Sequence, residues 1–126
     1  MSRALAFTLL AALSAAAQGA PQWQAPPDAA KKQNPLQSKP ELASGGEKVF
    51  RRNCLECHGD PKKGTSGKGP NLASEFVQQE SDGALFWKMT NGNSRAGMPS
   101  FSSLPEGQRW QLVLYIRSLP ALARGK

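Results

Sequence analysis

The chain is poor in the side chains that most often build metal and catalytic centres. Its 126 residues include one histidine and two cysteines. A structural zinc site usually takes four protein ligands, so these three residues, with no second cluster, argue against zinc. The sequence also lacks a stretch of alternating apolar and polar residues long enough for a convincing β-strand. These absences point away from zinc modules and sheet-based folds.

The first twenty residues, MSRALAFTLLAALSAAAQGA, are typical of an export signal. Arg3 precedes an apolar run over residues 4–17, and small residues then offer cleavage sites near positions 17–20. The run is shorter than the roughly 20 apolar residues that span a bilayer, although an uncleaved anchor or a buried helix is the alternative. We expect a periplasmic or otherwise exported protein with no membrane span in the mature chain.

Residues 21–41 are rich in proline, alanine, glutamine and lysine and have no helical or alternating pattern. Proline fixes φ and lacks an N–H donor, so stretches such as QAPPD and QNPLQSKP resist helix formation. We predict that this segment is a linker or a strap lying over the domain. The domain itself then covers residues 42–120, and residues 121–126 form a flexible tail.

Three later segments have helical patterns. GGEKVFRRNC places Val49 and Phe50 on one face, and GALFWKMTNG follows a serine and an aspartate that can cap a helix. In the third, Pro105 lies in the first turn of a helix that runs through WQLVLYIRSL and is closed by Pro120. The stretch between the first two is rich in glycine and proline and predicts a loop. Three short helices with long loops make a thin core, which a large apolar cofactor would complete.

Both cysteines and the histidine lie within NCLECHGD, residues 53–60. The cysteine spacing allows a structural disulfide or a thioredoxin-like thiol pair in an oxidising compartment. A thiol pair of that kind is expected in a βαβ context, and the missing strands count against it. A structural disulfide would close a very short loop and constrain little of the unfolded chain.

Covalent attachment of a haem gives every residue of the motif a role. Cys-x-x-Cys-His is the pattern of c-type haem attachment. The thiols of Cys54 and Cys57 add across the two vinyl groups of the porphyrin and form thioethers. His58, next to Cys57, is then held against the iron as an axial ligand. The motif therefore predicts haem c as the cofactor.

A methionine is the usual partner of histidine at such an iron. Met89 falls on the apolar face of the second predicted helix, where core packing is the simpler role. Met98 lies in the irregular stretch NSRAGMPSF, between Gly97 and Pro99. Gly97 would allow close backbone approach and Pro99 would stiffen the loop, which presents the Met98 sulfur to iron. The alternative is a loop methionine that fills a gap.

In this order of motifs, residues 42–119 resemble the small single-haem cytochromes c. ASGGEKVFRRNCLECHG is similar to their first helix and attachment motif, GKGPNL to the next loop, NSRAGMPSF to the sixth-ligand loop and WQLVLYIRSL to the final helix. The resemblance implies an all-α fold of about three to four short helices, with long loops around one covalently bound haem c. The proline-rich strap is a departure from the short members of the family.

The resemblance also implies roles for particular residues. Gly46 and Phe50 would lie where the first and last helices cross, with Trp110 and Tyr115 of the last helix nearby. The carbonyl of Pro70 would orient the imidazole of the axial histidine. A histidine–methionine pair leaves the iron no open position for a substrate, so electron transfer is favoured over catalysis.

We therefore expect an exported one-electron carrier between larger redox proteins, and not an enzyme. The alternatives are an electron-transfer subunit of a dehydrogenase or oxidase complex, a thiol–disulfide oxidoreductase that uses Cys54 and Cys57, or a haem protein with an open sixth position. The net charge of +7 favours redox partners with acidic docking surfaces. Nucleic acid is not expected, because the basic residues are scattered and not interleaved with aromatics.

Overall fold

The structure, a computed structural model, describes residues 23–125. This part of the chain is helical and contains no strand, so the expected all-α class is confirmed. The α-helices are α1 (Pro27–Ala30), α2 (Ala43–Asn53), α3 (Leu55–His58), α4 (Glu75–Gln78), α5 (Asp82–Asn91) and α6 (Glu106–Arg124), and the 3-10 helices are η1 (Pro40–Leu42) and η2 (Ser94–Ala96). The predicted export signal, residues 1–20, lies outside the described residues.

The three helices predicted from periodicity correspond to α2, α5 and α6. The start of α5 is capped by Ser81, whose hydroxyl accepts a hydrogen bond of 3.1 Å from the backbone N–H of Ala84. The helix number exceeds the expected three to four because α1, α3 and α4 are single turns of four residues. Such turns are too short to produce a periodic pattern.

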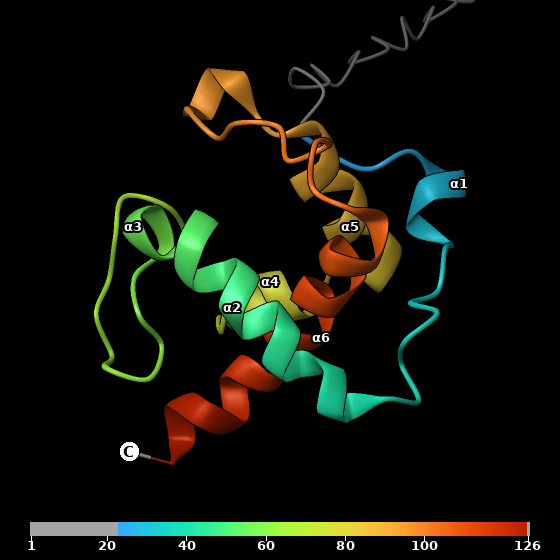
Figure 1. The fold of residues 1–126 in the computed structure, drawn as a ribbon. Coiled ribbons are helices and arrows are strands. Elements are labelled where there is room, and N and C mark those ends of the chain that lie inside the picture. The colour runs from blue at the N-terminus through green and yellow to red at the C-terminus, as the bar shows by residue number, and fades with distance from the viewer. Residues whose placement is uncertain (1–22, 126) are drawn as a thin grey trace, which may run out of the picture.

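The first long helix, α2, crosses the last helix, α6, and their contact forms the centre of the domain (Figure 1). The crossing is close because Gly46 has no side chain: a Cβ atom there would lie 2.0 Å from the backbone oxygen of Gln111. One turn further, the rings of Phe50 and Tyr115 pack with centroids 5.2 Å apart. Gly46 and Phe50 thus lie at the crossing that the resemblance implied.

Helix α5 packs against α6 on another side of the core. The rings of Phe86 and Trp110 stack with centroids 3.9 Å apart. Trp110, expected near the first helix, therefore contacts α5 through its ring. The buried apolar core draws on α2, α4, α5 and α6, and its largest members are Phe50, Leu85, Met89, Trp110, Leu112, Tyr115, Ile116 and Leu119.

The sequence predicted that the last helix ends at Pro120. This prediction is wrong, and α6 continues to Arg124. A proline inside a helix leaves the carbonyl four residues earlier without its usual donor. Here the carbonyl of Ile116 accepts a hydrogen bond of 3.0 Å from Nε2 of Gln78, which replaces the lost one. No helix of the described part of the chain, α6 included, is long and apolar enough to cross a membrane.

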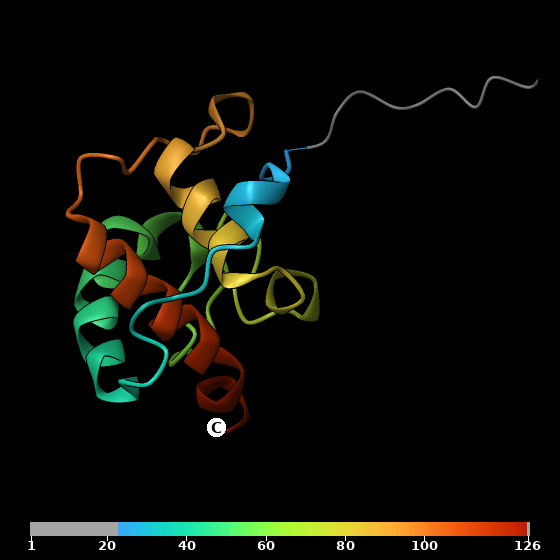
Figure 2. The same ribbon diagram turned by 90° about the vertical axis from the view of Figure 1, so that its right-hand side faces the viewer.

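The part of the predicted strap that precedes η1, residues 23–39 (hereafter the strap), lies against α5 and α6 (Figure 2). Asn34 is buried, and its Nδ2 donates a hydrogen bond of 3.0 Å to the backbone oxygen of Trp110. Ser81 Oγ donates a 2.7 Å hydrogen bond to the oxygen of Ala30 in α1. The segment is thus packed on the domain, while the domain boundaries drawn from the sequence stay a prediction.

Candidate functional site

The two cysteines lie at the junction between α2 and α3. Cys54 interrupts the helix with a φ of −121°, and Cys57 lies three residues on, within the single turn of α3. Residues three apart on a helical turn lie on neighbouring positions of its surface, so the spacing keeps the two thiols close in the chain. Cys54 is half-buried, Cys57 is exposed, and neither is in a disulfide. This arrangement suits two bonds to one edge of a planar group.

His58 closes α3, and its ring has a fixed orientation. Its Nδ1 atom lies 2.8 Å from the backbone oxygen of Pro70. Because a carbonyl oxygen only accepts, Nδ1 carries the proton and donates it, and the lone pair remains on Nε2. A histidine that binds iron through one nitrogen commonly donates its other N–H in this way.

The loop after the motif can approach α3 closely because it carries glycines. A Cβ atom on Gly69 would lie 2.9 Å from Nδ1 and Cε1 of His58, and one on Gly67 would lie 2.2 Å from the oxygen of Cys57. Gly59 has a φ of 77°, a conformation that favours glycine, and starts the loop directly after the histidine. These close approaches bring the Pro70 carbonyl to the imidazole.

A charged network anchors the same loop to α2. Asp60 is buried and accepts hydrogen bonds from the backbone N–H of Lys62 at 3.0 Å and from Arg51 Nη1 at 3.3 Å. Burial raises the pKa of Asp60, but these hydrogen bonds and the Arg51 charge outweigh it, so its pKa is lowered overall. Glu47 accepts from both Arg51 and Lys62, and the Lys62 hydrogen bond is the largest cause of its lowered pKa.

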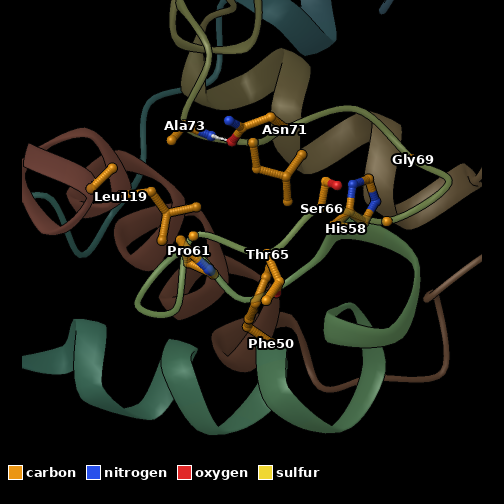
Figure 3. Close-up of a pocket in the computed structure, with 13 residues that line it drawn as sticks. Phe50, His58, Pro61, Thr65, Ser66, Gly69, Asn71, Ala73 and Leu119 are labelled. Carbon is orange, nitrogen blue, oxygen red and sulfur yellow. Dashed lines mark hydrogen bonds between the residues drawn. The ribbon is translucent and has the colours of Figure 1, made fainter. Parts of the chain in front are cut away.

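A small cavity of about 150 Å³ borders the histidine on the loop side (Figure 3). Phe50 of α2 and Leu119 of α6 form part of its wall, and Ser66 and Gly69 lie next to His58 at its rim. Ligand pockets commonly enclose about 300–1,000 Å³. The cavity is therefore a packing gap beneath the loop.

The chemistry of Cys54 does not suit the attacking thiol of a redox centre. Burial, and secondarily the neighbouring Cys57, raises the pKa of Cys54 to about 12. A redox-active thiol pair depends on a cysteine whose pKa is lowered, because the thiolate is the nucleophile. Cys54 is a neutral thiol at physiological pH, so attack on a disulfide is disfavoured.

Met98 lies on a separate loop between α5 and α6. Its backbone pairs with that of Asn93 through two hydrogen bonds of 2.9 Å, which close the loop into a tight turn. A close backbone approach within the loop occurs at Gly92, where a Cβ atom would lie 2.6 Å from Pro99. Gly97 has open space around it, and its φ of 80° explains the glycine there.

The structure thus brings four of the five expected site residues together, namely Cys54, Cys57, His58 and Pro70. Met98 is half-buried and packs at the edge of the core. Its role as sixth ligand stays a prediction. Sequence reasoning missed Gly69 and Asp60, which position the loop. A glycine directly before Pro70 was the available signal for the first, but nothing local identified Asp60 as an anchor.

Comparison with known families agrees with this geometry. The family described as cytochrome c oxidase, cbb3-type, subunit III matches residues 41–116, which is more than half of the chain. The chain belongs to this family. Membership makes it a small c-type cytochrome and implies haem c as its cofactor. The strap lies outside the matched region.

Two curated relatives are also named as subunits of a cbb3-type cytochrome c oxidase. The cbb3-type cytochrome c oxidase subunit FixP of Bradyrhizobium sp. (strain ORS 278) is 40% identical over 81 residues, and that of Bradyrhizobium diazoefficiens is 38% identical over 80 residues. Each match covers 61% of this chain but 27% of the relative, so the chain spans about a quarter of their length. No solved structure gives a significant match.

These relatives correct one expectation. The sequence led us to expect a protein that is not an enzyme, whereas both relatives are subunits of an enzyme, cytochrome c oxidase.

The residues present also fit the cofactor that the family implies. Two free thiols lie three residues apart, and the adjacent imidazole has its Nε2 lone pair available. Electron transfer is therefore the function that the family and the site share.

Proposed function

We propose that this chain is an electron-transfer subunit or module of a cbb3-type cytochrome c oxidase, with one covalently bound haem c. The observation that carries the proposal is the 2.8 Å contact between His58 Nδ1 and the Pro70 oxygen, directly after the two free cysteines. When bound, haem c supplies an iron that takes up and releases one electron at a time.

Each site residue has a defined task in this proposal. Cys54 and Cys57 hold the cofactor through thioethers, which prevents its loss after export. His58 binds the iron through Nε2, while the Pro70 carbonyl keeps the ring in one orientation. Met98 is the sixth ligand, and its thioether raises the reduction potential compared with a second nitrogen ligand.

The export of the chain is part of the proposal. Residues 1–20 act as the signal, residues 42–120 form the cytochrome domain, and the domain works on the periplasmic side of the membrane. Mass measurement of the mature protein tests the first point, because cleavage near residues 17–20 removes the apolar run. A mature chain that still begins at Met1 would contradict it.

The basic surface supports docking on an acidic redox partner. The net charge of +7 becomes +6 once the signal with Arg3 is removed. Attraction to such a partner therefore raises the association rate, and salt screens that attraction. The rate of electron transfer to the partner oxidase should therefore fall as ionic strength rises. A rate of electron transfer that does not change with salt would contradict a role of the basic surface in docking.

The oxidase assignment is tested in the source organism. Deletion of the gene should lower oxygen consumption by cbb3-type oxidase, and the wild-type chain should restore it. The double variant Cys54→Ala/Cys57→Ala, which cannot attach haem, should not. Unchanged oxygen consumption after deletion, together with a reduced carrier found free of the oxidase, would show instead the diffusible carrier expected from the sequence.

A further inference from the structure

The N-terminal end of the strap meets the loop that carries Met98. Trp23 lines an open groove together with residues 91–100. Met98 is half-buried, whereas residues 94–97 of the same loop are exposed. The loop therefore has little packing of its own on the outer side, and Trp23 is the one side chain from elsewhere in the described chain that lines this groove.

Trp23 is itself held in place by α5. The ammonium group of Lys88 lies 5.0 Å from the centroid of the Trp23 ring, within the range of a cation–π contact. Lys88 also pairs with Glu80 at 2.5 Å, and its side chain is only 13% exposed. A cation that is fixed and partly removed from water attracts an aromatic face more strongly than a mobile surface lysine does.

The strap behind Trp23 is fastened at two further points. Close contact with α5 occurs at Gly83, where a Cβ atom would lie 2.2 Å from the oxygen of Ala29. Further along, buried Asn34 donates a hydrogen bond to the oxygen of Trp110. The strap therefore cannot move away from α5 without breaking these contacts.

The Trp23 ring acts through packing in the described structure. Its Nε1 is buried, and no acceptor among residues 23–125 lies within hydrogen-bonding distance. A ring without this N–H, such as phenylalanine, would keep most of the contact area. The smaller alanine side chain would open the groove beside the Met98 loop.

We propose that Trp23 is a positioning residue that restrains the Met98 loop, so that the strap keeps methionine on the iron. The inference rests on the proposed function, because it requires Met98 as sixth ligand. The geometry behind it is the shared groove of Trp23 and residues 91–100 together with the anchoring of Trp23 by Lys88. A restrained loop lowers the entropy that methionine gains by leaving the iron, and so disfavours exchange with other ligands.

The test is a titration of the ferric holoprotein, as the full mature chain, with imidazole. Binding forms an iron–nitrogen bond and releases the Met98 sulfur without a change of oxidation state, and the methionine–iron charge-transfer band reports it. Trp23→Ala should raise the apparent affinity for imidazole about tenfold, as expected if roughly 1.4 kcal/mol of restraint is lost. Trp23→Phe should stay near wild type.

A second pair of variants separates restraint from general destabilisation. Leu36→Ala removes a partly buried apolar side chain from the strap beyond the Asn34 anchor, away from the Met98 loop. It should lower thermal stability but leave imidazole affinity unchanged. Gly83→Ala pushes the strap away from α5 while Trp23 stays intact, and should reproduce the effect of Trp23→Ala even if that variant does not fold.

The outcomes distinguish the two proposals. A wild-type methionine–iron band combined with equal imidazole affinity in wild type, Trp23→Ala and Gly83→Ala would overturn only the role of the strap. Equal increases in Trp23→Ala and Leu36→Ala would also overturn it, because the effect would then follow stability. A wild-type protein with haem but without the band would overturn the proposed Met98 ligation and this inference together.

Discussion

The Nδ1 atom of His58 lies 2.8 Å from the backbone oxygen of Pro70. This contact joins the end of α3 to a loop residue twelve positions later. Because the acceptor is a backbone carbonyl, its position depends on the path of the loop and not on a rotamer. The loop follows that path through Gly67 and Gly69, which leave no room for a Cβ atom. The orientation of the His58 ring is thus set by glycines.

Gly69→Ala should disturb this orientation. The new methyl group would lie 2.9 Å from two ring atoms of His58, so the ring or the loop has to shift and the hydrogen bond to Pro70 weakens. Weaker donation makes the imidazole a poorer donor to iron, which favours the ferrous state. We expect the reduction potential to rise by tens of millivolts, where about 59 mV corresponds to a tenfold change. Potentiometric titration measures it.

Gly107→Ala is the matched control for that prediction. Gly107 has open space around a new Cβ atom, and it lies on α6, outside the loop of residues 59–70 that follows His58. The reduction potential of Gly107→Ala should equal that of the wild type. An unchanged potential in Gly69→Ala as well would contradict the link between the loop path and the iron ligand.

Gly46→Ala should destabilise the domain at the crossing of α2 and α6. The added Cβ atom would lie 2.0 Å from the backbone oxygen of Gln111, so the helices have to move apart. Overpacking of this kind costs about 1–3 kcal/mol in free energy of unfolding. Gly107→Ala should leave that free energy unchanged or raise it by up to about 1 kcal/mol, because alanine is the better helix former. Denaturant unfolding of both holoproteins compares them, and equal stabilities would contradict the close crossing.

Acid should weaken the anchor of the loop of residues 59–70 through Asp60. The pKa of Asp60 is lower in the folded protein than its ordinary value of 3.8, so the folded state binds the proton less readily than the unfolded state. Its contribution is fully present above pH 3.8 and is lost as the pH falls through the lowered folded value. Asp60→Asn should lower the free energy of unfolding by about 1–2 kcal/mol at pH 7. It should also show a shallower fall of stability below pH 4 than the wild type.

Parallel acid-unfolding curves for Asp60→Asn and wild type would show that another carboxylate controls the transition. Glu47 is the next candidate, because it pairs with the same Arg51 and its pKa is also lowered, chiefly by the hydrogen bond from Lys62. Acid unfolding of Glu47→Gln, measured in the same way, shows how much Glu47 contributes to the loss of stability in acid.

The long helices and the attachment motif could be predicted from the sequence because both are local patterns. Periodicity identified α2, α5 and α6, and Cys54, Cys57 and His58 are adjacent in the chain. The end of α6 could not be predicted, because the carbonyl freed by Pro120 is satisfied by Gln78 from a distant segment. The one-turn helices α1, α3 and α4 were missed for want of length.

The packing of the strap was equally hidden in the sequence. Proline content indicated only that the segment is not a long helix. Its position depends on Asn34, which is buried against the Trp110 carbonyl, and on the absence of a side chain at Gly83. Neither residue belongs to a recognisable motif. The same reason applies to Trp23, whose partners Lys88 and residues 91–100 are distant in the chain.

The most direct test of the central claim combines intact mass with the absorption spectrum of the oxidised protein, expressed with the haem-attachment machinery. The account predicts the added mass of one haem, lost in Cys54→Ala/Cys57→Ala, and a methionine–iron charge-transfer band that disappears in Met98→Ala. A protein without added mass, or a wild-type protein with high-spin iron and no such band, would contradict it.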